Sequence, residues 1–286
     1  MTNSVFNVVS YVWEHPANSQ GRVLALIQAA RAQATMRLSP SRKVRLTRSG
    51  VTFDVASGQY GISKAIYAWP PDYPEMRAWQ RILRAGDTFI DVGANAGLYS
   101  LWAGWLGAHV TAFEPSSEIW DALLSNVALN PTADVKCVKD AVGASSGLAS
   151  ITIGRGAENV VASGGPAGEE TEEVAVVTLD EFAGDASLRG VKIDIEGHEI
   201  EALEGARAAL AEHRIDVLQV EWNEASLHAR GDSREPCARL LRDCEYTLCR
   251  PDRDGRLALS EDISMSSADM FAVSPEYARS IGMLVN

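Results

Sequence analysis

The sequence predicts an α/β fold in which helices cover both faces of a mostly parallel sheet. From residue 86 onward, short apolar segments alternate with longer amphipathic ones, as in strand–helix–strand units. Several of the apolar segments lack the polar alternation of a half-exposed strand, which indicates burial on both faces. Several also end in Asp, Glu or Gly, and ligands of such sheets bind outside the carboxyl ends of the strands.

Residues 1–70 are predicted to form an extension to this fold. Apolar residues recur at helical spacing over 21–37, where Ser39-Pro40 should end the helix, and a short strand is expected at 51–55. The stripe of this helix is Val23, Leu24, Ile27, Ala30 and Ala34. An aromatic-rich run follows, with Tyr60, Tyr67, Trp69, Tyr73 and Trp79. The extension is interpreted as a lid or an oligomerisation element, with ordinary packing on the main domain as the alternative.

The main domain is predicted to span residues 71–286 and to begin with a helix at 73–84. Strands are expected at 88–92, 109–113, 134–142, 148–153, 174–179, 191–195, 216–222, 245–249 and 270–273. Helices are expected at 96–106, 118–129, from 198 to about 210, and at 233–243. The segment Gly154–Glu173 has no periodicity and is interpreted as a loop.

Charge is unevenly distributed along the chain of 286 residues. The net charge is −12, yet residues 1–53 hold seven basic residues and one acidic residue, so this segment is +6 and the remainder is −18. The acidic balance argues against a nucleic-acid or anionic-membrane binder. No apolar run is long enough to span a bilayer, and the N-terminus lacks a secretory pattern. The four cysteines have no metal-ligand spacing, so we expect buried, reduced thiols in a cytoplasmic protein.

A glycine loop follows the first strand of the main domain. Asp91 precedes Gly93 and Gly97, and this spacing differs from the G-x-G-x-x-G loop that holds a pyrophosphate. The next strand ends in Glu114, where an acid can accept both hydroxyls of a ribose, and Pro115 stops that strand. Asp91 would repel a phosphate and suits a cationic ligand. A ribose with a positive centre and no phosphate indicates S-adenosylmethionine.

Two further pairs of residues lie near this loop in the predicted fold. Asp140 and Ala141 end the third strand, where a purine edge could be read. Asn126 and Asn130 lie four residues apart on a helix and are interpreted as a solvated position and a helix cap.

A second group of polar residues follows the strand at 191–195. Lys192, Asp194 and Glu196 alternate with apolar residues, and Gly197 then turns the chain into His198. The following strand ends in Glu221. Charged residues in a central strand need partners or a function. His198 is a candidate general base, while Asp194 and Glu221 are candidate Mg²⁺ ligands that would orient a sugar diol. Pairing among these charges is the structural alternative.

Three stretches resemble the FkbM family of S-adenosylmethionine-dependent methyltransferases. They are FIDVGANAGLYSLWAG at 89–104, VTAFEPSSEIWDALLSNVALN at 110–130, and VTLDEF with VKIDIEGHEIEALEGA within 177–206. The resemblance covers roughly residues 75–225. It implies a Rossmann-like, seven-stranded class I methyltransferase sheet and makes 71–286 the catalytic domain. Positions matching the family's cofactor site are Asp91, Gly93, Asn95, Gly97 and Glu114. Ala94, Pro115, Asp140 and Ala141 are predicted to bind the cofactor from their places beside the loop and at the strand ends, not from the resemblance. The acidic rim beside the acceptor matches Asp194, Glu196 and Glu221.

The resemblance implies O-methylation of a hydroxyl on a sugar or a glycosylated or secondary metabolite. The implied partner is a small, sugar-containing molecule, with no nucleic acid, no membrane span and a homo-oligomer as a further expectation. Mg²⁺ is a second expected cofactor, through Asp194 and Glu221. Two alternatives stay open at this point. One is a peptide or small-molecule N-methyltransferase, and the other is an NAD(P)-dependent oxidoreductase with the same acid after its second strand.

Overall fold

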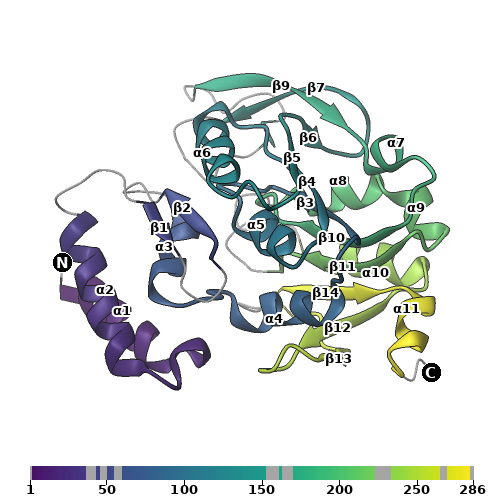
Figure 1. The fold of residues 1–286 in the computed structure, drawn as a ribbon. Helices are drawn as coiled ribbons and strands as arrows, with labels where there is room; N and C mark the ends of the chain where they lie inside the picture. The colour runs from purple at the N-terminus through teal and green to yellow at the C-terminus, as the bar shows by residue number, and fades with distance from the viewer. Residues whose placement is uncertain are drawn as a thin grey trace.

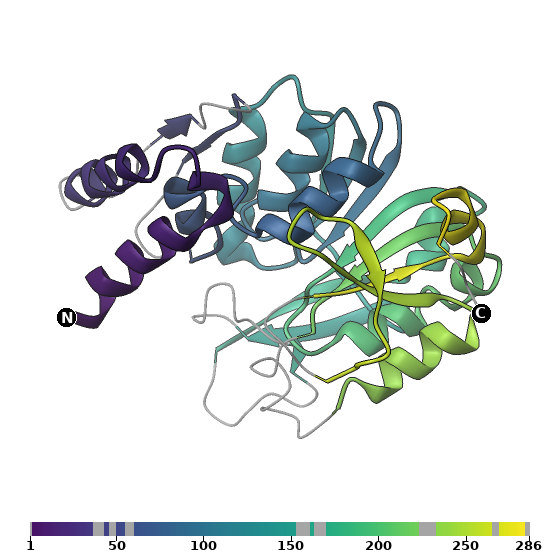
Figure 2. The ribbon, with the colours of Figure 1, turned by 90° about the horizontal axis from the view of Figure 1, so that it is seen from below.

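A computed structural model describes most of the chain. The described residues are 2–36, 43–45, 50–54, 60–152, 161–162, 170–222, 233–264 and 269–283. The main sheet lies at the centre of the larger body, and the N-terminal helices project from one side of it (Figures 1 and 2).

The main sheet has eight strands in the order β13-β12-β14-β11-β10-β3-β4-β5. The parallel strands are β3 (Thr88–Val92), β4 (His109–Phe113), β5 (Val135–Val138), β10 (Leu188–Ile193) and β11 (Ile215–Val220). The antiparallel edge consists of β14 (Met270–Val273), β12 (Thr247–Pro251) and β13 (Leu257–Leu259). The predicted α/β fold is confirmed, and β13 adds an eighth strand to the expected seven.

The strand order reverses its direction of travel between β3 and β10, which are adjacent and parallel. Loops after the two strands therefore leave toward opposite faces and open a crevice at their carboxyl ends. Asp91 lies opposite Lys192 in this pair, so the glycine loop and the second acidic segment begin side by side.

Helices cover both faces of the sheet, as predicted. On one face lie α4 (Tyr73–Ile82), α5 (Leu98–Trp105) and α11 (Pro275–Ser280). On the other lie α7 (Leu179–Ala183), α8 (Glu199–Glu204), α9 (Arg207–Ala211) and α10 (Glu235–Asp243). Alternation sends Phe89 to the first face and Ile90 to the second. The expected single helix after residue 198 is two short helices, which are separated at Gly205, where an added Cβ would lie 2.0 Å from the carbonyl oxygen of Gly143.

The segment expected as one strand at 134–142 is divided between two sheets. Its second half, β6 (Ala141–Val142), joins a separate sheet of order β6-β9-β7-β8. This sheet also contains β7 (Gly147–Thr152), β8 (Val161–Ala162) and β9 (Thr171–Val177). The rest of the predicted loop Gly154–Glu173 lies largely outside the described residues.

The N-terminal extension comprises two helices packed as a hairpin, a small strand pair and a third helix. These are α1 (Thr2–Glu14), η1 (Pro16–Asn18), α2 (Arg22–Met36), β1 (Lys43–Arg45), β2 (Thr52–Asp54) and α3 (Tyr60–Tyr67). Phe53 and Ile62 share a buried cluster with Ala96 and Leu101 of the main domain. The second part of the extension therefore packs into the main domain across the predicted boundary at residue 70.

Two asparagines of α6 (Ser117–Ala128) and its following turn fasten β2 to the body. The side-chain oxygen of Asn126 accepts a hydrogen bond from the backbone of Asp54 at 2.8 Å, and its amide donates to Ala96 at 2.8 Å. Asn130 pairs with the backbone of Thr52 through both its oxygen and its nitrogen. The expectation of a solvated Asn126 is wrong, since its side chain is fully buried in these contacts.

No helix among the described residues combines the length and apolar character needed to cross a membrane.

Candidate functional site

The glycine loop is held against the end of β10. Gly93 has φ +79°, and a Cβ added there would lie 1.9 Å from the carbonyl oxygen of Asp194. The amides of Gly93 and Ala94 both donate to the carbonyl of Phe113, at 3.0 and 2.9 Å. Only glycine satisfies the close approach and the left-handed backbone together. The loop thus brings the carboxyl ends of β3 and β10 within contact of each other.

Asp91 is buried beneath this loop and has one oxygen available to a ligand. Its Oδ2 accepts a hydrogen bond from the Ser100 hydroxyl at 2.6 Å. Its Oδ1 is buried and has no hydrogen-bond partner among the described residues. Burial raises the pKa of Asp91, while Lys192 opposes that shift. An acceptor atom left in this state fits a ligand that supplies a donor or a positive charge.

Glu114 lies at the end of β4 with both carboxylate oxygens fixed by the backbone. Oε2 accepts from the amide of Asn95 at 2.9 Å, and Oε1 accepts from the amide of Ser116 at 3.0 Å. Each oxygen keeps a second lone pair for a hydroxyl donor. Burial raises the pKa of Glu114 to about 7, although the two amides oppose the shift.

A cavity of about 380 Å³ joins these features, which is a size typical of small-molecule sites. The predicted residues on its wall are Asp91, Gly93, Ala94, Asn95, Glu114, Pro115, Asp140, Ala141, Asp194, Glu196 and Glu221. Two predicted site residues, Gly97 and His198, are not on this wall. Gly97 has φ +91° and is the N-cap of α5, so it sets the turn from the loop into the helix.

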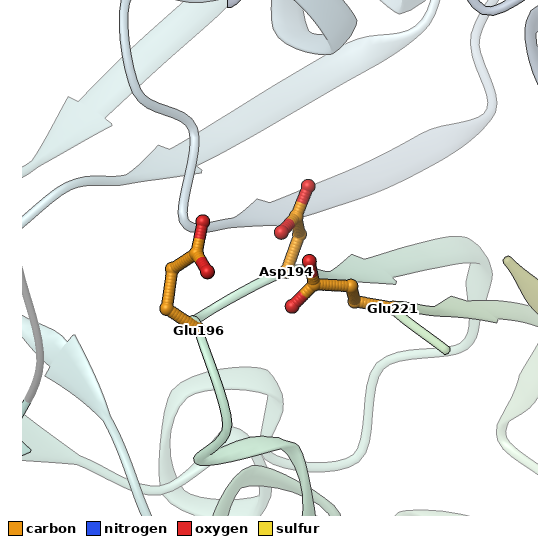
Figure 3. Close-up of side chains that lie close together, drawn as sticks. All are labelled: Asp194, Glu196 and Glu221. Atoms are coloured by element: carbon orange, nitrogen blue, oxygen red, sulfur yellow. The ribbon is translucent and has the colours of Figure 1, made fainter. Parts of the chain in front are cut away.

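Asp194, Glu196 and Glu221 form an acidic cluster on the cavity wall. One oxygen from each lies within 4.8 Å of the others, and Figure 3 shows the three carboxylates gathered from the ends of β10 and β11. Glu196 has φ +54°, an uncommon backbone conformation for a residue with a side chain. Burial and then the negative charges of Asp194 and Glu196 raise the pKa of Glu221 to about 10.

Two cations contact this cluster among the described residues: Lys192 at Asp194, and Arg234, whose Nη2 lies 3.9 Å from Glu221 Oε2. From the sequence alone, Lys192 is predicted only as a charge partner. Its ammonium lies 2.7 Å from Asp194 Oδ2 and 4.6 Å from the centre of the Tyr99 ring, with the side chain 3% exposed. Burial lowers the pKa of Lys192, but Asp194 and Asp91 outweigh it and raise the pKa above its usual value. Alternation along β10 placed Lys192 beside Asp194, and this was the signal available in the sequence.

A buried ion pair shapes the turn after β10. Glu199 accepts from the amides of Ile195 and Gly197, both at 3.1 Å, and pairs with Arg234. His198 precedes α8 and is buried, with Nδ1 3.6 Å from Glu201 Oε1. The structure therefore separates His198 from the cavity, in contrast to its expected place beside Asp194. The chain turns at Gly197 as expected, and both Glu196 and Gly197 have positive φ in that turn.

The N-terminal extension contributes part of the wall. Ile62 and Lys64 of α3 line the cavity, as does Asp72. Of the run at 60–79, Tyr67, Trp69, Tyr73 and Trp79 are not on this wall. Trp79 is fully buried against Phe89 and Phe271, and Trp69 packs edge-on against Trp102. These two tryptophans therefore pack with the body.

A family model described as "Methyltransferase FkbM domain" matches residues 91–248 of the chain. This match covers more than half of the sequence and includes both the glycine loop and the acidic cluster. The chain belongs to the FkbM methyltransferase family. It is an S-adenosylmethionine-dependent methyltransferase, and the alternative of a nicotinamide oxidoreductase is thereby replaced.

Solved structures with a similar fold are distant from this FkbM methyltransferase. Precorrin-6y C5,15-methyltransferase from Geobacter metallireducens is 12% identical, with 78% of this chain and 95% of that chain covered and a TM-score of 0.43. The T. thermophilus 16S rRNA N2 G1207 methyltransferase is 14% identical, with 82% and 50% covered and a TM-score of 0.46. The Pyrococcus abyssi tRNA (uracil-54, C5)-methyltransferase is 11% identical, with 82% and 44% covered and a TM-score of 0.43. The chain spans half or less of the latter two. No curated protein matches the chain.

Proposed function

We propose that this FkbM methyltransferase transfers a methyl group to a hydroxyl of a sugar or of a glycosylated or secondary metabolite. The observation that carries the proposal is the acidic cluster of Asp194, Glu196 and Glu221, which lies on the same cavity wall as the glycine loop. Carboxylates accept hydrogen bonds from hydroxyls and can receive the proton that a hydroxyl loses.

The cofactor half of the cavity is assigned to the glycine loop and its two acids. S-adenosylmethionine, when bound, supplies a methyl group on a sulfonium that is already activated for displacement. We assign the buried Oδ1 of Asp91 to the cationic amino-acid part and the two oxygens of Glu114 to the ribose hydroxyls. The backbone of Gly93–Asn95 would approach the ligand closely, with Gly97 holding the loop. Pro115, Asp140 and Ala141 would border the purine.

The acceptor half is assigned to the acidic cluster. The acceptor oxygen forms a bond to the methyl carbon while the carbon–sulfur bond breaks, and the hydroxyl proton passes to a carboxylate. Asp194 is the proposed recipient, because Lys192 fixes its orientation and leaves a second oxygen toward the cavity. The raised pKa of Glu221 favours its protonated form, which can donate a hydrogen bond to a neighbouring acceptor oxygen. Glu196, which has a left-handed backbone conformation, is the third carboxylate of the acidic cluster.

We expect this site to act without a metal ion. Asp194 and Glu221 are the residues that would hold Mg²⁺, where the ion would orient a diol and favour its ionised form. However, the ammonium of Lys192 already supplies a positive charge at Asp194, and the guanidinium of Arg234 lies 3.9 Å from Glu221. Full activity in a strong chelator is therefore the expected result. Loss of activity that Mg²⁺ restores would assign the ion to this cluster.

N-methylation of an amine fits the cluster less well. A carboxylate group beside an amine favours the protonated ammonium, which has no lone pair for the methyl group. The acidic balance of the chain likewise supports a small-molecule acceptor over a nucleic acid, because a polyanion is repelled.

The test is methyl transfer from isotopically labelled cofactor to small molecules extracted from the source cells. Mass spectrometry of the labelled product should find the label in a methyl ether. A label on nitrogen, or on RNA or protein, would contradict the proposed acceptor class. Chemically methylated standards of a hydroxyl and an amine provide the control.

We propose that the two parts of residues 1–70 have different roles. Helix α3 would form a wall of the acceptor site through Ile62 and Lys64. The hairpin of α1 and α2 would serve assembly instead.

A further inference from the structure

Helix α2 is apolar on two opposite sides. Its inner side consists of Ala25, Ala29 and Ala32, which are at most 8% exposed. Its outer face is defined here as Val23, Leu24, Ile27, Ala30 and Ala34. The three large members are 64%, 60% and 49% exposed in that order, and both alanines are exposed. At about 100° per residue the two sets are centred on opposite sides of the helix.

The outer face is the very stripe that made the helix recognisable in the sequence. A stripe of this kind normally faces the core of its own chain, but here small alanines occupy that side. The hairpin projects away from the body in both views (Figures 1 and 2). A helix that is apolar on both sides is typical of one that is buried on both sides. Because the outer face is exposed among the described residues, it is available to a partner.

We propose that the outer face of α2 packs against the same face of a second copy, antiparallel and across a two-fold axis. Val23, Ile27, Ala30 and Ala34 are spaced by four, three and four residues, which is the spacing of a helix–helix seam. The side chains in the N-terminal half of the seam, Val23 and Ile27, are large, and those in the C-terminal half, Ala30 and Ala34, are small.

An antiparallel pair makes this seam complementary to itself. With the axis between residues 28 and 29, Ile27 faces Ala30 of the second copy and Val23 faces Ala34 of the second copy. Each large side chain then meets a small one, which fills the space between the helices. A parallel pair would place alanine on alanine and leave voids at one end.

The flank of the seam is compatible with the same arrangement. Leu24 of one copy would lie beside the aliphatic stem of Arg31 of the second copy. The two Arg31 residues would be about 8 Å apart along the helix axis, given a rise of about 1.5 Å per residue.

Charge favours a second copy over a membrane or a polyanion. Residues 1–53 carry +6 and the rest of the chain carries −18. The opposite signs of the two parts favour association between copies of the chain. An anionic bilayer or a nucleic acid would attract the basic segment but repel the body.

The first test is the mass of the full-length protein in solution, measured by light scattering during size exclusion at tens of micromolar. Twice the chain mass of 30.8 kDa is expected for the wild type, and the single-chain mass for Ile27→Lys. The matched control is Leu148→Lys on β7, since Leu148 is 69% exposed and remote in sequence from the hairpin. Circular dichroism establishes that each variant is folded. A monomeric wild type, or a dimeric Ile27→Lys, overturns the proposal.

The second test fixes the orientation by cysteine cross-linking on a non-reducing gel. The double variant Val23→Cys/Ala34→Cys should form a covalent dimer under mild oxidation. Val23→Cys alone should not, because the two sites would be about 16 Å apart along an antiparallel pair. The wild type, with its four native cysteines, is the background control. Cross-linking by Val23→Cys alone overturns the antiparallel arrangement. Flotation of the wild type with anionic phospholipid vesicles, abolished by Ile27→Lys, overturns the second copy as the occupant.

Discussion

At the scale of single residues, Glu114 links the cofactor site to pH. Its pKa is raised to about 7 by burial, so the carboxylate form, which accepts ribose hydroxyls, becomes dominant as pH rises through neutrality. We expect the affinity for S-adenosylhomocysteine, measured by calorimetry, to increase between pH 6 and 8. Glu114→Gln should lose most of this pH dependence. Glu114→Ala should weaken binding by about 1–3 kcal/mol at pH 8. An unchanged pH profile in Glu114→Gln would remove Glu114 from the ribose site.

Gly93 offers a second test with a natural control in the same chain. Gly86 has a similar φ of +88° but open space around its Cβ position, whereas a Cβ on Gly93 meets the Asp194 carbonyl. Both Gly→Ala variants should pay backbone strain of about 1–3 kcal/mol in unfolding free energy. Only Gly93→Ala should also lose S-adenosylhomocysteine binding, by tenfold or more. Equal binding by the two variants would contradict the close contact between the loop and β10.

The sequence predicted these residues because strand ends in a parallel sheet converge on one edge. Asp91, Glu114, Asp194 and Glu221 all line the cavity for that reason. His198 was expected at the same edge because it follows the turn at Gly197, but the sequence does not set the direction in which the chain leaves a turn with two left-handed residues.

At the scale of elements, the attachment of β2 to α6 is the contact that the sequence least revealed. An asparagine on a helix is ordinarily solvated, and its hydrogen bonds to a strand 72 residues earlier have no local signature. The division of 134–142 between two sheets is similar, since the apolar pattern continues across it while the pairing partner changes.

Asn126→Ala tests this attachment. The change leaves the Asp54 amide and the Ala96 carbonyl without their buried partner, so a loss of about 1–3 kcal/mol in unfolding free energy is expected. Because Ala96 lies in the glycine loop, affinity for S-adenosylhomocysteine should fall as well. Chemical denaturation and calorimetry measure the two effects. Ser125→Ala, at an exposed position of the same helix, should change neither. A stability loss without any change in affinity would show that β2 does not support the loop.

At the scale of the whole molecule, the extension and the main domain share a core. Phe53 is 1% exposed within a cluster that includes Leu101 of α5. Residues 51–67 should therefore unfold together with the main sheet. Phe53→Ala is expected to lower the melting temperature of the entire protein through a loss of about 3–5 kcal/mol. Leu148→Ala, at an exposed site, is the control. A separate early transition in Phe53→Ala, with the main one unmoved, would support a domain boundary at residue 70 instead.

Part of the negative charge of the chain is concentrated at the cavity. The −18 of residues 54–286 includes a group of acids gathered on one cavity wall, where they face the ends of β3, β4, β10 and β11. Composition gave the imbalance, but only the sheet order brings those acids together.

We propose that one part of the cavity binds the cofactor and another part binds the methyl acceptor, with Asp194 in the acceptor part. The most direct test is Asp194→Asn, assayed for methyl transfer and for S-adenosylhomocysteine affinity on the same preparation, with Asp254→Asn as an exposed control. We expect Asp194→Asn to lose turnover by about 10²-fold or more, while its cofactor affinity stays within a few-fold of the wild type. Wild-type turnover in Asp194→Asn, or a parallel loss of cofactor binding, would contradict this proposal.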